Sequence, residues 1–354
     1  MKIGLTSDWH ISQYSSIVRS NGKEYSTRLE HLIDSINWAE SLFSTMGCYA
    51  HICLGDAFDK AELNAAEISA LKKIIWGKMY HYFIVGNHEM ASSDLSKNTA
   101  NLFDLMPNCR VIDRPSMLSI SGEYDIFVLP YILNANRKPL EEYFENYPQK
   151  PEIILSHNDI KGIQMGSFIS QDGFTIDEIQ ANCKLFINGH IHNCGQVADG
   201  IYNIGNLCGQ NFSEDAFVYP HVAWIIDTET KEIKTFENPY ALRFYKLDFT
   251  ENNGIDYIND ISSKIKPNAV VTVRCKEKDL DYLRARFGKE PNDLMPHNCN
   301  IIESRFVVDY SCSEQLEHSE TILSVDHLNQ FENYVKENIG VSELIMSELQ
   351  EVLK

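Results

Sequence analysis

The sequence lacks any apolar run that could cross a membrane, because no stretch approaches the roughly 20 consecutive apolar residues that a spanning helix needs. It also shows no secretory leader, since Met1-Lys2 leads directly into a short apolar segment. Internal repeats and low-complexity tracts are equally missing. We therefore expect an ordinary folded chain without a membrane span.

Paired cysteines are also missing. The nine cysteines are an odd number and include no Cys-x-x-Cys motif. Cys53 lies within an apolar run and Cys183 immediately precedes another. Scattered cysteines of this kind behave as small buried apolar residues in a reducing compartment. This pattern argues against a zinc ribbon and a disulfide framework, and it predicts a cytoplasmic protein.

The sequence has fewer basic residues than acidic ones. The chain has 31 basic and 50 acidic residues, which gives a net charge of −19. Such a surface repels polyanions at long range and argues against general coating of nucleic acid. A nuclease is still possible, because bound metals or a local basic patch can reverse the field at one site.

What the sequence does contain is a series of five short polar segments, each directly after an apolar run. They are Asp8-Trp9-His10, Gly55-Asp56-Ala57-Phe58-Asp59, Gly86-Asn87-His88-Glu89, Ser156-His157-Asn158-Asp159 and Gly189-His190-Ile191-His192. The apolar runs are typical of buried strands. In α/β folds, functional sites gather beyond the carboxyl ends of strands. Carboxylates, imidazoles and carboxamides bind divalent metals, so the five segments predict one metal site.

The residue types fit a centre with two metal ions. Two ions about 4 Å apart need a ligand that reaches both, and a carboxylate has two oxygens for this. Asp56 suits that position because Gly55 permits a tight turn before it. The remaining candidate ligands are Asp8, His10, Asn87, His157, His190 and His192.

His88 is left over from the ligand set. It stands next to Asn87 and can steady the transition state or protonate the leaving oxygen. Asp59, Glu89 and Asp159 either orient ligand histidines or serve in caps and turns. Trp9 is interpreted as a packing residue. The other histidines are interpreted as structural or surface residues: His31, His51, His81, His221, His297, His318 and His327.

The spacing of apolar residues predicts the elements around these segments. An amphipathic helix is expected over 29–46 and a second over 65–78, with Ile68, Leu71, Ile74 and Ile75 facing inward. A hairpin is expected over 117–131, followed after the fifth segment by strands over 201–204, 222–226 and 233–236. Two mixed sheets with helices outside fit this order better than one parallel sheet.

A domain boundary is expected at Asn238-Pro239. Beyond it, strand, helix, strand and helix patterns over 242–249, 255–265, 269–275 and 280–287 predict a small α/β unit. Its basic residues form either a solvated surface or a face that contacts phosphates: Lys264, Lys266, Arg274, Lys276, Lys278, Arg284, Arg286 and Lys289. The segment 324–354 predicts one or two amphipathic helices, packed on the body or offered to a partner.

The five segments resemble the calcineurin-like metallophosphoesterase superfamily, with its pattern D-x-H, G-D-x-x-D, G-N-H-[DE], a later histidine and G-H-x-H. The resemblance covers roughly residues 1–240. It implies a four-layer α/β/β/α sandwich and hydrolysis of phosphoesters with two divalent metals, often manganese. It assigns Asp8, His10, Asp56 and His192 to one metal and Asp56, Asn87, His157 and His190 to the other. His88 is then the catalytic, transition-state histidine.

Finer details are similar to the nuclease subunits of SbcCD-type double-strand-break repair complexes, including phage recombination endonucleases. These details are Thr6-Ser7-Asp8-Trp9-His10, the aromatic Phe58, Leu129-Pro130-Tyr131-Ile132 and the small unit after Pro239. The polar stretch 11–23 and the strong acidity depart from that pattern. The resemblance implies three parts: a nuclease domain (1–240), a small α/β cap (241–312) and a C-terminal helical segment that binds a partner (313–354).

The leading hypothesis is a manganese-dependent DNA exonuclease or endonuclease, with Mg²⁺, Fe²⁺ or Zn²⁺ as other possible metals. Its expected partners are duplex DNA ends and an SMC-like, SbcC-like ATPase, with a homodimer also possible. The host cytoplasm is its expected location if the chain is phage-encoded. The alternatives are a stand-alone phosphatase or cyclic-nucleotide phosphodiesterase, and a scaffold that binds without turnover. The intact ligand set and His88 argue against the scaffold.

Overall fold

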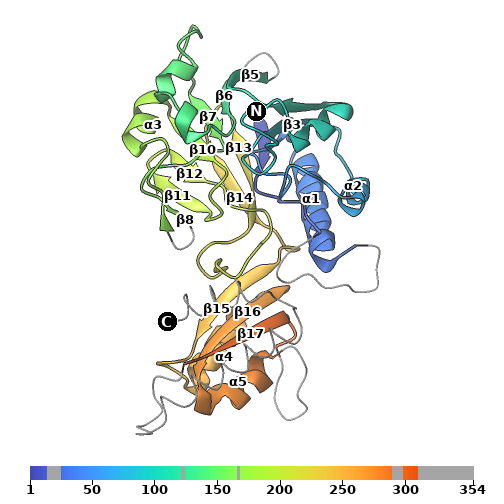
Figure 1. The fold of residues 1–354 in the computed structure, drawn as a ribbon, viewed down its shortest axis with the longest axis vertical. Helices are drawn as coiled ribbons and strands as arrows, with labels where there is room; N and C mark the ends of the chain where they lie inside the picture. Colours follow the sequence, from blue (N-terminus) through green and yellow to red (C-terminus); the bar gives the residue numbers. More distant parts are fainter. Residues whose placement is uncertain (14–24, 121–123, 166–167, 289–297, 310–354) are drawn as a thin grey trace, which may run out of the picture. The chain divides into compact units, whose positions relative to one another are not determined.

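The computed structural model describes residues 1–13, 25–120, 124–165, 168–288 and 298–309 (Figure 1). By internal contacts the chain divides into two units, Met1–Val308 and Asp309–Lys354. The amphipathic helices predicted over 324–354 lie outside the described residues, as do most of 11–23 and Lys289. The division into 1–240, 241–312 and 313–354 stays a prediction.

Two mixed six-stranded sheets form the larger part of the first unit. The first sheet has the order β14 (Ile233–Glu237), β13 (Val222–Asp227), β1 (Lys2–Thr6), β2 (Ala50–Cys53), β3 (Tyr80–Ile84) and β4 (Cys109–Ile112). The second has the order β11 (Gly195–Ala198), β12 (Ile201–Asn203), β10 (Leu185–Asn188), β7 (Ile153–Ser156), β6 (Tyr124–Leu129) and β5 (Ser116–Ile120).

Parallel pairing at the centre of each sheet determines where the five polar segments meet. Strands β1, β2 and β3 run parallel, so the segments that follow them leave at the same edge of the first sheet. Strands β7 and β10 are also parallel and deliver two further segments from the second sheet. The predicted hairpin is confirmed, because β5 and β6 pair antiparallel.

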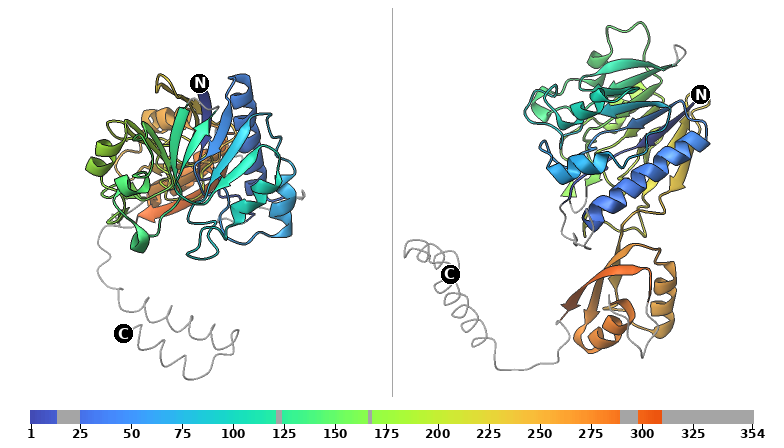
Figure 2. Two further views of the ribbon diagram at one scale, coloured as in Figure 1. Left: turned by 90° about the horizontal axis from the view of Figure 1, so that it is seen from above. Right: turned by 90° about the vertical axis from the view of Figure 1, so that its right-hand side faces the viewer.

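Alternating side chains divide the core into layers. In β6, Ile126 and Val128 pack with residues of the first sheet, whereas Phe127 and Leu129 pack on the opposite face with α3 (Ile176–Asn182). Helices α1 (Thr27–Thr45) and α2 (Ala65–Leu71) contribute to the core on the outer face of the first sheet. Figures 1 and 2 show α1 along that sheet. The predicted α/β/β/α sandwich is confirmed.

The second predicted helix is wrong in length. It ends at Leu71 rather than Lys78, and Ile68 and Ile75 are exposed by 44% and 75% instead of facing inward. The cause is in α1, where Asn37 accepts the backbone N–H of Ile75 through Oδ1 at 2.7 Å. That bond draws the chain onto α1 and away from a helical path.

The small α/β unit contains a third sheet with the order β15 (Arg243–Asp248), β16 (Ala269–Lys276) and β17 (Ile301–Asp309). Its core also includes residues from α4 (Ile255–Lys264) and α5 (Leu280–Phe287). The four predicted elements are present, and β17 is an additional strand that the sequence pattern did not predict. The remaining elements are short: η1 (Thr99–Leu105), η2 (Asn134–Asn136), η3 (Leu140–Tyr143), β8 (Gln164–Met165), β9 (Phe168–Ile169) and η4 (Glu277–Asp279).

None of the helices in the described part of the chain is long and apolar enough to cross a membrane.

Candidate metal centre

The backbone at the site adopts an uncommon conformation. Four non-glycine residues of the five polar segments have left-handed φ angles: Asp8 (51°), His10 (46°), Asp56 (50°) and His190 (64°). This region is unfavourable for residues with a Cβ atom and costs on the order of 1–3 kcal/mol per residue. Such strain persists only where the surrounding structure enforces it, and it concentrates at functional sites.

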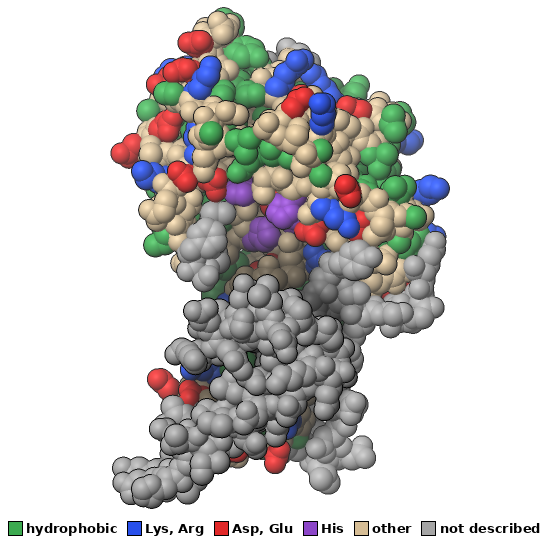
Figure 3. Space-filling view, in the orientation of Figure 1, with side chains coloured by type: hydrophobic (Ala, Val, Ile, Leu, Met, Phe, Trp, Pro, Cys, Tyr) green, Lys and Arg blue, Asp and Glu red, His purple; other side chains and the backbone are tan. Residues whose placement is uncertain are grey.

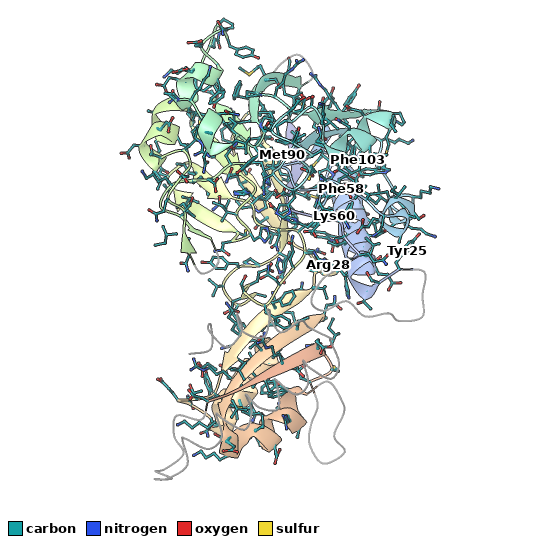
Figure 4. All side chains as sticks on the ribbon, in the orientation of Figure 1. Tyr25, Arg28, Phe58, Lys60, Met90 and Phe103 are labelled. Atoms are coloured by element: carbon teal, nitrogen blue, oxygen red, sulfur yellow. The ribbon has the colours of Figure 1, made fainter. Side chains whose placement is uncertain are left out.

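Backbone hydrogen bonds tie the first two segments together. Asp8 donates its N–H to the carbonyl of Gly55 at 3.0 Å, and His10 donates to that of Asp56 at 2.9 Å. The Asp8 and Asp56 side chains therefore emerge next to each other. Phe58 continues from the second segment into the core, where it stacks on Phe103 with ring centroids 5.1 Å apart (Figure 4).

One group of possible ligands consists of Asp8, His10 and His192. His10 Nε2 lies 3.7 Å and His192 Nε2 lies 3.6 Å from Asp8 Oδ1. Asp8 Oδ1 and His10 Nε2 are buried without a hydrogen-bond partner among the described residues. An unpartnered buried carboxylate oxygen is costly, so these atoms fit a cation between them.

The second group consists of Asp56, His157 and His190, with Asn87 beside it. His157 donates from Nδ1 to the carbonyl of Leu54 at 2.6 Å, which leaves Nε2 for a ligand. That Nε2 lies 3.1 Å from Asp56 Oδ2 and 3.3 Å from Asn87 Oδ1. The three atoms converge as ligands around one ion do.

Asp56 belongs to the second group and also lies beside His10 of the first. Its Oδ2 lies 3.1 Å from His157 Nε2 and 3.8 Å from His10 Nε2. Gly86 makes room for this carboxylate, since a Cβ atom there would lie 2.1 Å from Asp56 Oδ1. The position that the sequence assigned to a bridging carboxylate is therefore flanked by histidines from both groups.

The electrostatic field at the centre favours positive charge. Burial lowers the pKa of His10, but the Asp59 and Asp8 carboxylates outweigh it and raise that pKa to about 10. Burial likewise opposes protonation of His157, whereas Asp56 raises its pKa to about 9. The same carboxylates would stabilise a bound metal ion, which would take the place of the proton. The residues present thus fit two divalent cations.

His88 lies at the edge of this arrangement. Its Nδ1 lies 2.9 Å from the carbonyl oxygen of Asp59, so Nδ1 is the donor and Nε2 remains available. The imidazole contacts that of His10 edge-on, with ring centroids 4.6 Å apart, and its side chain is 41% exposed. Figure 3 shows histidine side chains gathered at the surface of this unit. A substrate can therefore reach His88.

The family model for calcineurin-like phosphoesterases matches residues 1–194. The chain belongs to this family. Its members use two metal ions, and the chain is accordingly a metal-dependent phosphoester hydrolase. No curated protein matches the chain significantly.

Several solved structures are similar to this phosphoesterase at low identity. A novel archaeal phosphodiesterase is 16% identical over 67% of this chain and 99% of its own, with a TM-score of 0.35. A dimetal phosphatase from Danio rerio is 11% identical over 67% and 96%, also with a TM-score of 0.35. The NAD nucleotidase of Haemophilus influenzae is 10% identical over 80% and 59%, with a TM-score of 0.34.

The three acidic residues whose roles were open have distinct positions in this phosphoesterase. Asp59 Oδ1 lies 3.3 Å from His10 Nδ1, and Asp159 Oδ1 lies 3.1 Å from His190 Nε2, so both orient histidines. Glu89 instead accepts backbone N–H groups from Gly86, Asp56 and Phe58 at 2.6–3.2 Å. It thereby joins the segments after β2 and β3. Burial and the charge of Asp56 raise the pKa of Glu89 to about 7.

Two charged residues at the site were not predicted from the sequence. Glu214, from the segment between β12 and β13, places Oε1 3.7 Å from His192 Nδ1 and accepts a hydrogen bond from Asn206. Arg137, after η2, lies 3.7 Å from Asp159 Oδ2. Neither belongs to a recognisable motif, so only the fold shows their proximity to the ligands.

Four of the histidines outside the five segments lie in the described residues, and three do not. His31 is near the surface and contacts the carbonyl of Tyr240. His221 is buried and contacts Asn206. His51 and His81 form a fully buried cluster with Glu40. His297, His318 and His327 lie outside the described residues.

Proposed function

We propose that this phosphoesterase is a Mn²⁺-dependent phosphodiesterase that cleaves DNA, acting with an SMC-like ATPase. The observation that carries the phosphodiesterase part is the shared carboxylate of Asp56 between two histidine-containing groups, with His88 Nε2 available beside them. DNA as the substrate rests on the resemblance of the segments around Asp8 and Asp56 to nuclease subunits of SbcCD-type complexes.

The residues divide into two ligand sets. Asp8, His10 and His192, with Asp56 beside them, would hold one ion, and Asp56, Asn87, His157 and His190 would hold the other. When bound, two divalent ions supply Lewis-acid activation of the attacking water and neutralise charge that develops on the phosphate. Asp59, Asp159 and Glu214 hold the rings of three of these histidines in orientation, each through one ring nitrogen, and so leave the other nitrogen for an ion.

His88 is the catalytic residue in this proposal. Because its Nδ1 donates to the carbonyl of Asp59, the ring can present Nε2 to a phosphate oxygen or to the leaving oxygen. A protonated Nε2 stabilises the negative charge of the transition state and can transfer its proton to the departing alkoxide.

A second candidate is a phosphatase or cyclic-nucleotide phosphodiesterase that works without DNA. Its support is the charge distribution of the small α/β unit, where several basic side chains are paired with acids. Lys264 contacts Asp260 at 2.7 Å, and Lys266 contacts Glu237. Arg274 lies 3.9 Å from Asp248. Paired cations attract a phosphate backbone less than free ones do.

The substrate assay compares linear duplex DNA, bis-aryl phosphate and mono-aryl phosphate, each with Mn²⁺. The DNA proposal predicts that the duplex is degraded and that His88→Ala abolishes this while Mn²⁺ still binds. His31→Ala is the matched control, because His31 belongs to neither ligand group and contacts the carbonyl of Tyr240. Turnover of the small phosphates without cleavage of DNA would favour the second candidate.

The partner proposal concerns the segment 324–354. Its deletion is expected to abolish association with an SMC-like ATPase and to leave hydrolysis of bis-aryl phosphate unchanged. Association that persists after the deletion would contradict this assignment. Sedimentation of the full chain alone distinguishes a homodimer from a monomer.

A further inference from the structure

A buried cluster of three titratable side chains lies apart from the metal centre. Glu40 comes from α1, His51 from β2 and His81 from β3, and each is at most 2% exposed. No sequence motif connects them. Three such groups inside an apolar core need a physical explanation, because each carries a desolvation cost.

Within the cluster, both carboxylate oxygens of Glu40 have partners. His51 Nδ1 lies 2.6 Å from Oε1, and His81 Nε2 lies 3.0 Å from Oε2. Oε2 also accepts the backbone N–H of Gly77 at 2.9 Å. Although glutamate and histidine can bind metals, these atoms already satisfy one another. The cluster is therefore a hydrogen-bond network and not a second metal site.

The network continues from His51 toward the ligands. His51 Nε2 lies 2.7 Å from Oγ1 of Thr6, and the same Oγ1 accepts the indole N–H of Trp9 at 2.9 Å. Trp9 stands between Asp8 and His10 in the chain. A continuous path of hydrogen bonds thus leads from Glu40 on α1 to the turn that carries two proposed ligands.

The direction of each hydrogen bond follows from the groups involved. An ionised carboxylate only accepts, so His51 Nδ1 must donate to Glu40. Burial lowers the pKa of His51, which favours its neutral form with a lone pair on Nε2. Thr6 has one hydroxyl proton, which it donates to that Nε2 while it accepts from Trp9. Every donor and acceptor along the path is then used once.

The turn at the end of this path is strained and therefore needs support. Asp8 and His10 both have left-handed φ angles, of 51° and 46°. Between them, the fully buried Trp9 packs edge-on against Phe83 with ring centroids 5.8 Å apart. Packing fills the space around the indole, and the hydrogen bond to Thr6 fixes its rotation. Asp8 and His10 flank Trp9 in the chain, so the backbone that carries the indole also carries their side chains.

We propose that Glu40, His51, Thr6 and Trp9 form a positioning chain that holds Asp8 and His10 in the geometry of metal ligands. These are positioning residues and not catalytic ones, since they act through the turn. The inference rests on the metal centre assigned under Proposed function. It adds that the affinity of the first ion depends on a network buried beneath it.

The first test compares Thr6→Val with Thr6→Ser in the full chain. Valine keeps the shape of threonine but removes the hydroxyl, whereas serine keeps the hydroxyl. Calorimetric titration with Mn²⁺ is expected to show about tenfold weaker binding of one ion in Thr6→Val, at the lower end of losses from outer partners of ligands. Thr6→Ser is expected to bind like the unmodified chain. Equal affinities for Thr6→Val and the unmodified chain overturn the proposal.

A matched pair of histidine variants separates positioning from general destabilisation. His51→Asn can still donate to Glu40 but is too short to reach Thr6. His81→Asn changes an equally buried partner of the same carboxylate that is off the path to Trp9. The proposal predicts weaker Mn²⁺ binding in His51→Asn and unchanged binding in His81→Asn. Equal losses in both variants contradict it.

A spectroscopic measurement tests the path without a change in sequence. Nitrogen NMR of the histidine rings is expected to show His51 neutral, with its proton on Nδ1. A proton on Nε2 would reverse the bond to Thr6 and overturn the proposal. If the unmodified chain binds no Mn²⁺, the metal centre is wrong and the inference falls with it. If the unmodified chain binds Mn²⁺ and the variants bind it with the same affinity, the metal centre stands and only the positioning chain is wrong.

Discussion

The backbone N–H of His88 donates a 3.0 Å hydrogen bond to Oδ1 of Asp56. The carboxylate between the two ligand groups therefore also fixes the loop that carries the catalytic imidazole. Asp56 Oδ2 remains directed to the histidines, at 3.1 Å from His157 and 3.8 Å from His10. One side chain thus relates the position of His88 to that of the proposed ions.

His88→Ala is expected to lower the hydrolysis rate without loss of metal. The substitution removes the imidazole but keeps the backbone N–H that Asp56 accepts, so the ligands stay in place. Loss of a general acid typically lowers a rate by roughly 10²–10⁴-fold. Steady-state hydrolysis of bis-aryl phosphate and a Mn²⁺ titration on the same sample measure both effects. An unchanged rate would contradict the catalytic assignment.

Gly86→Ala is expected to abolish binding of Mn²⁺. Its Cβ atom would lie 2.1 Å from Asp56 Oδ1, a contact that forces the shared carboxylate or the β3 loop to move. Gly254→Ala is the matched control, because the nearest heavy atom to its Cβ lies 3.6 Å away. Calorimetry on both variants provides the comparison. Retention of two bound ions in Gly86→Ala would count against Asp56 as the bridge.

Asp159→Asn is expected to lower the affinity for one of the two ions by about tenfold. Loss of a carboxylate that contacts a ligand histidine typically has this effect. Asp159 contacts His190 Nε2 at 3.1 Å and is itself 3.7 Å from Arg137. The neutral amide loses the charge that orients the ring. Mn²⁺ titration of this variant and of Asp199→Asn, an exposed control, measures the effect. Equal affinities in the two variants would contradict the role of Asp159.

The buried cluster predicts a pH dependence of folding. Burial lowers the pKa of His51 from its ordinary 6.5, so the unfolded chain takes up this proton more readily. Burial opposes ionisation of Glu40, but His51 and His81 hold its pKa below the ordinary 4.5. Both groups therefore destabilise the folded state as the pH falls, His51 from about 6.5 and Glu40 from about 4.5 downward.

The free energy of unfolding by urea, measured between about pH 8 and pH 4 without metal, checks this expectation. The difference between the unmodified chain and His51→Asn reports on the group that the variant removes. The advantage of the unmodified chain should shrink as the pH falls through 6.5. A difference that is independent of pH would be inconsistent with a neutral His51.

Local patterns in the sequence predicted the strands and the polar segments that follow them, because each depends on neighbouring residues. Glu214 and Arg137 could not be predicted, since their proximity to His192 and Asp159 arises only when distant segments fold together. The left-handed backbone conformation of Asp8 and Asp56 could not be predicted from the sequence either, because aspartate does not require it.

In the second helix, the local pattern predicted more helix than the structure contains. Its apolar spacing extends to Lys78, but Asn37 and Glu40 on α1 take the N–H groups of Ile75 and Gly77. A tertiary contact ends the helical path that local spacing favours. β17 was missed for a related reason, since an edge strand depends on its neighbour β16.

Crystals soaked with Mn²⁺ provide the strongest test of the two-ion centre, through an anomalous difference map recorded at the manganese edge. We expect two peaks about 4 Å apart, one on each side of the Asp56 carboxylate. The first should contact Asp8, His10 and His192, and the second Asn87, His157 and His190. A single peak, or two peaks that do not share Asp56, would contradict this expectation.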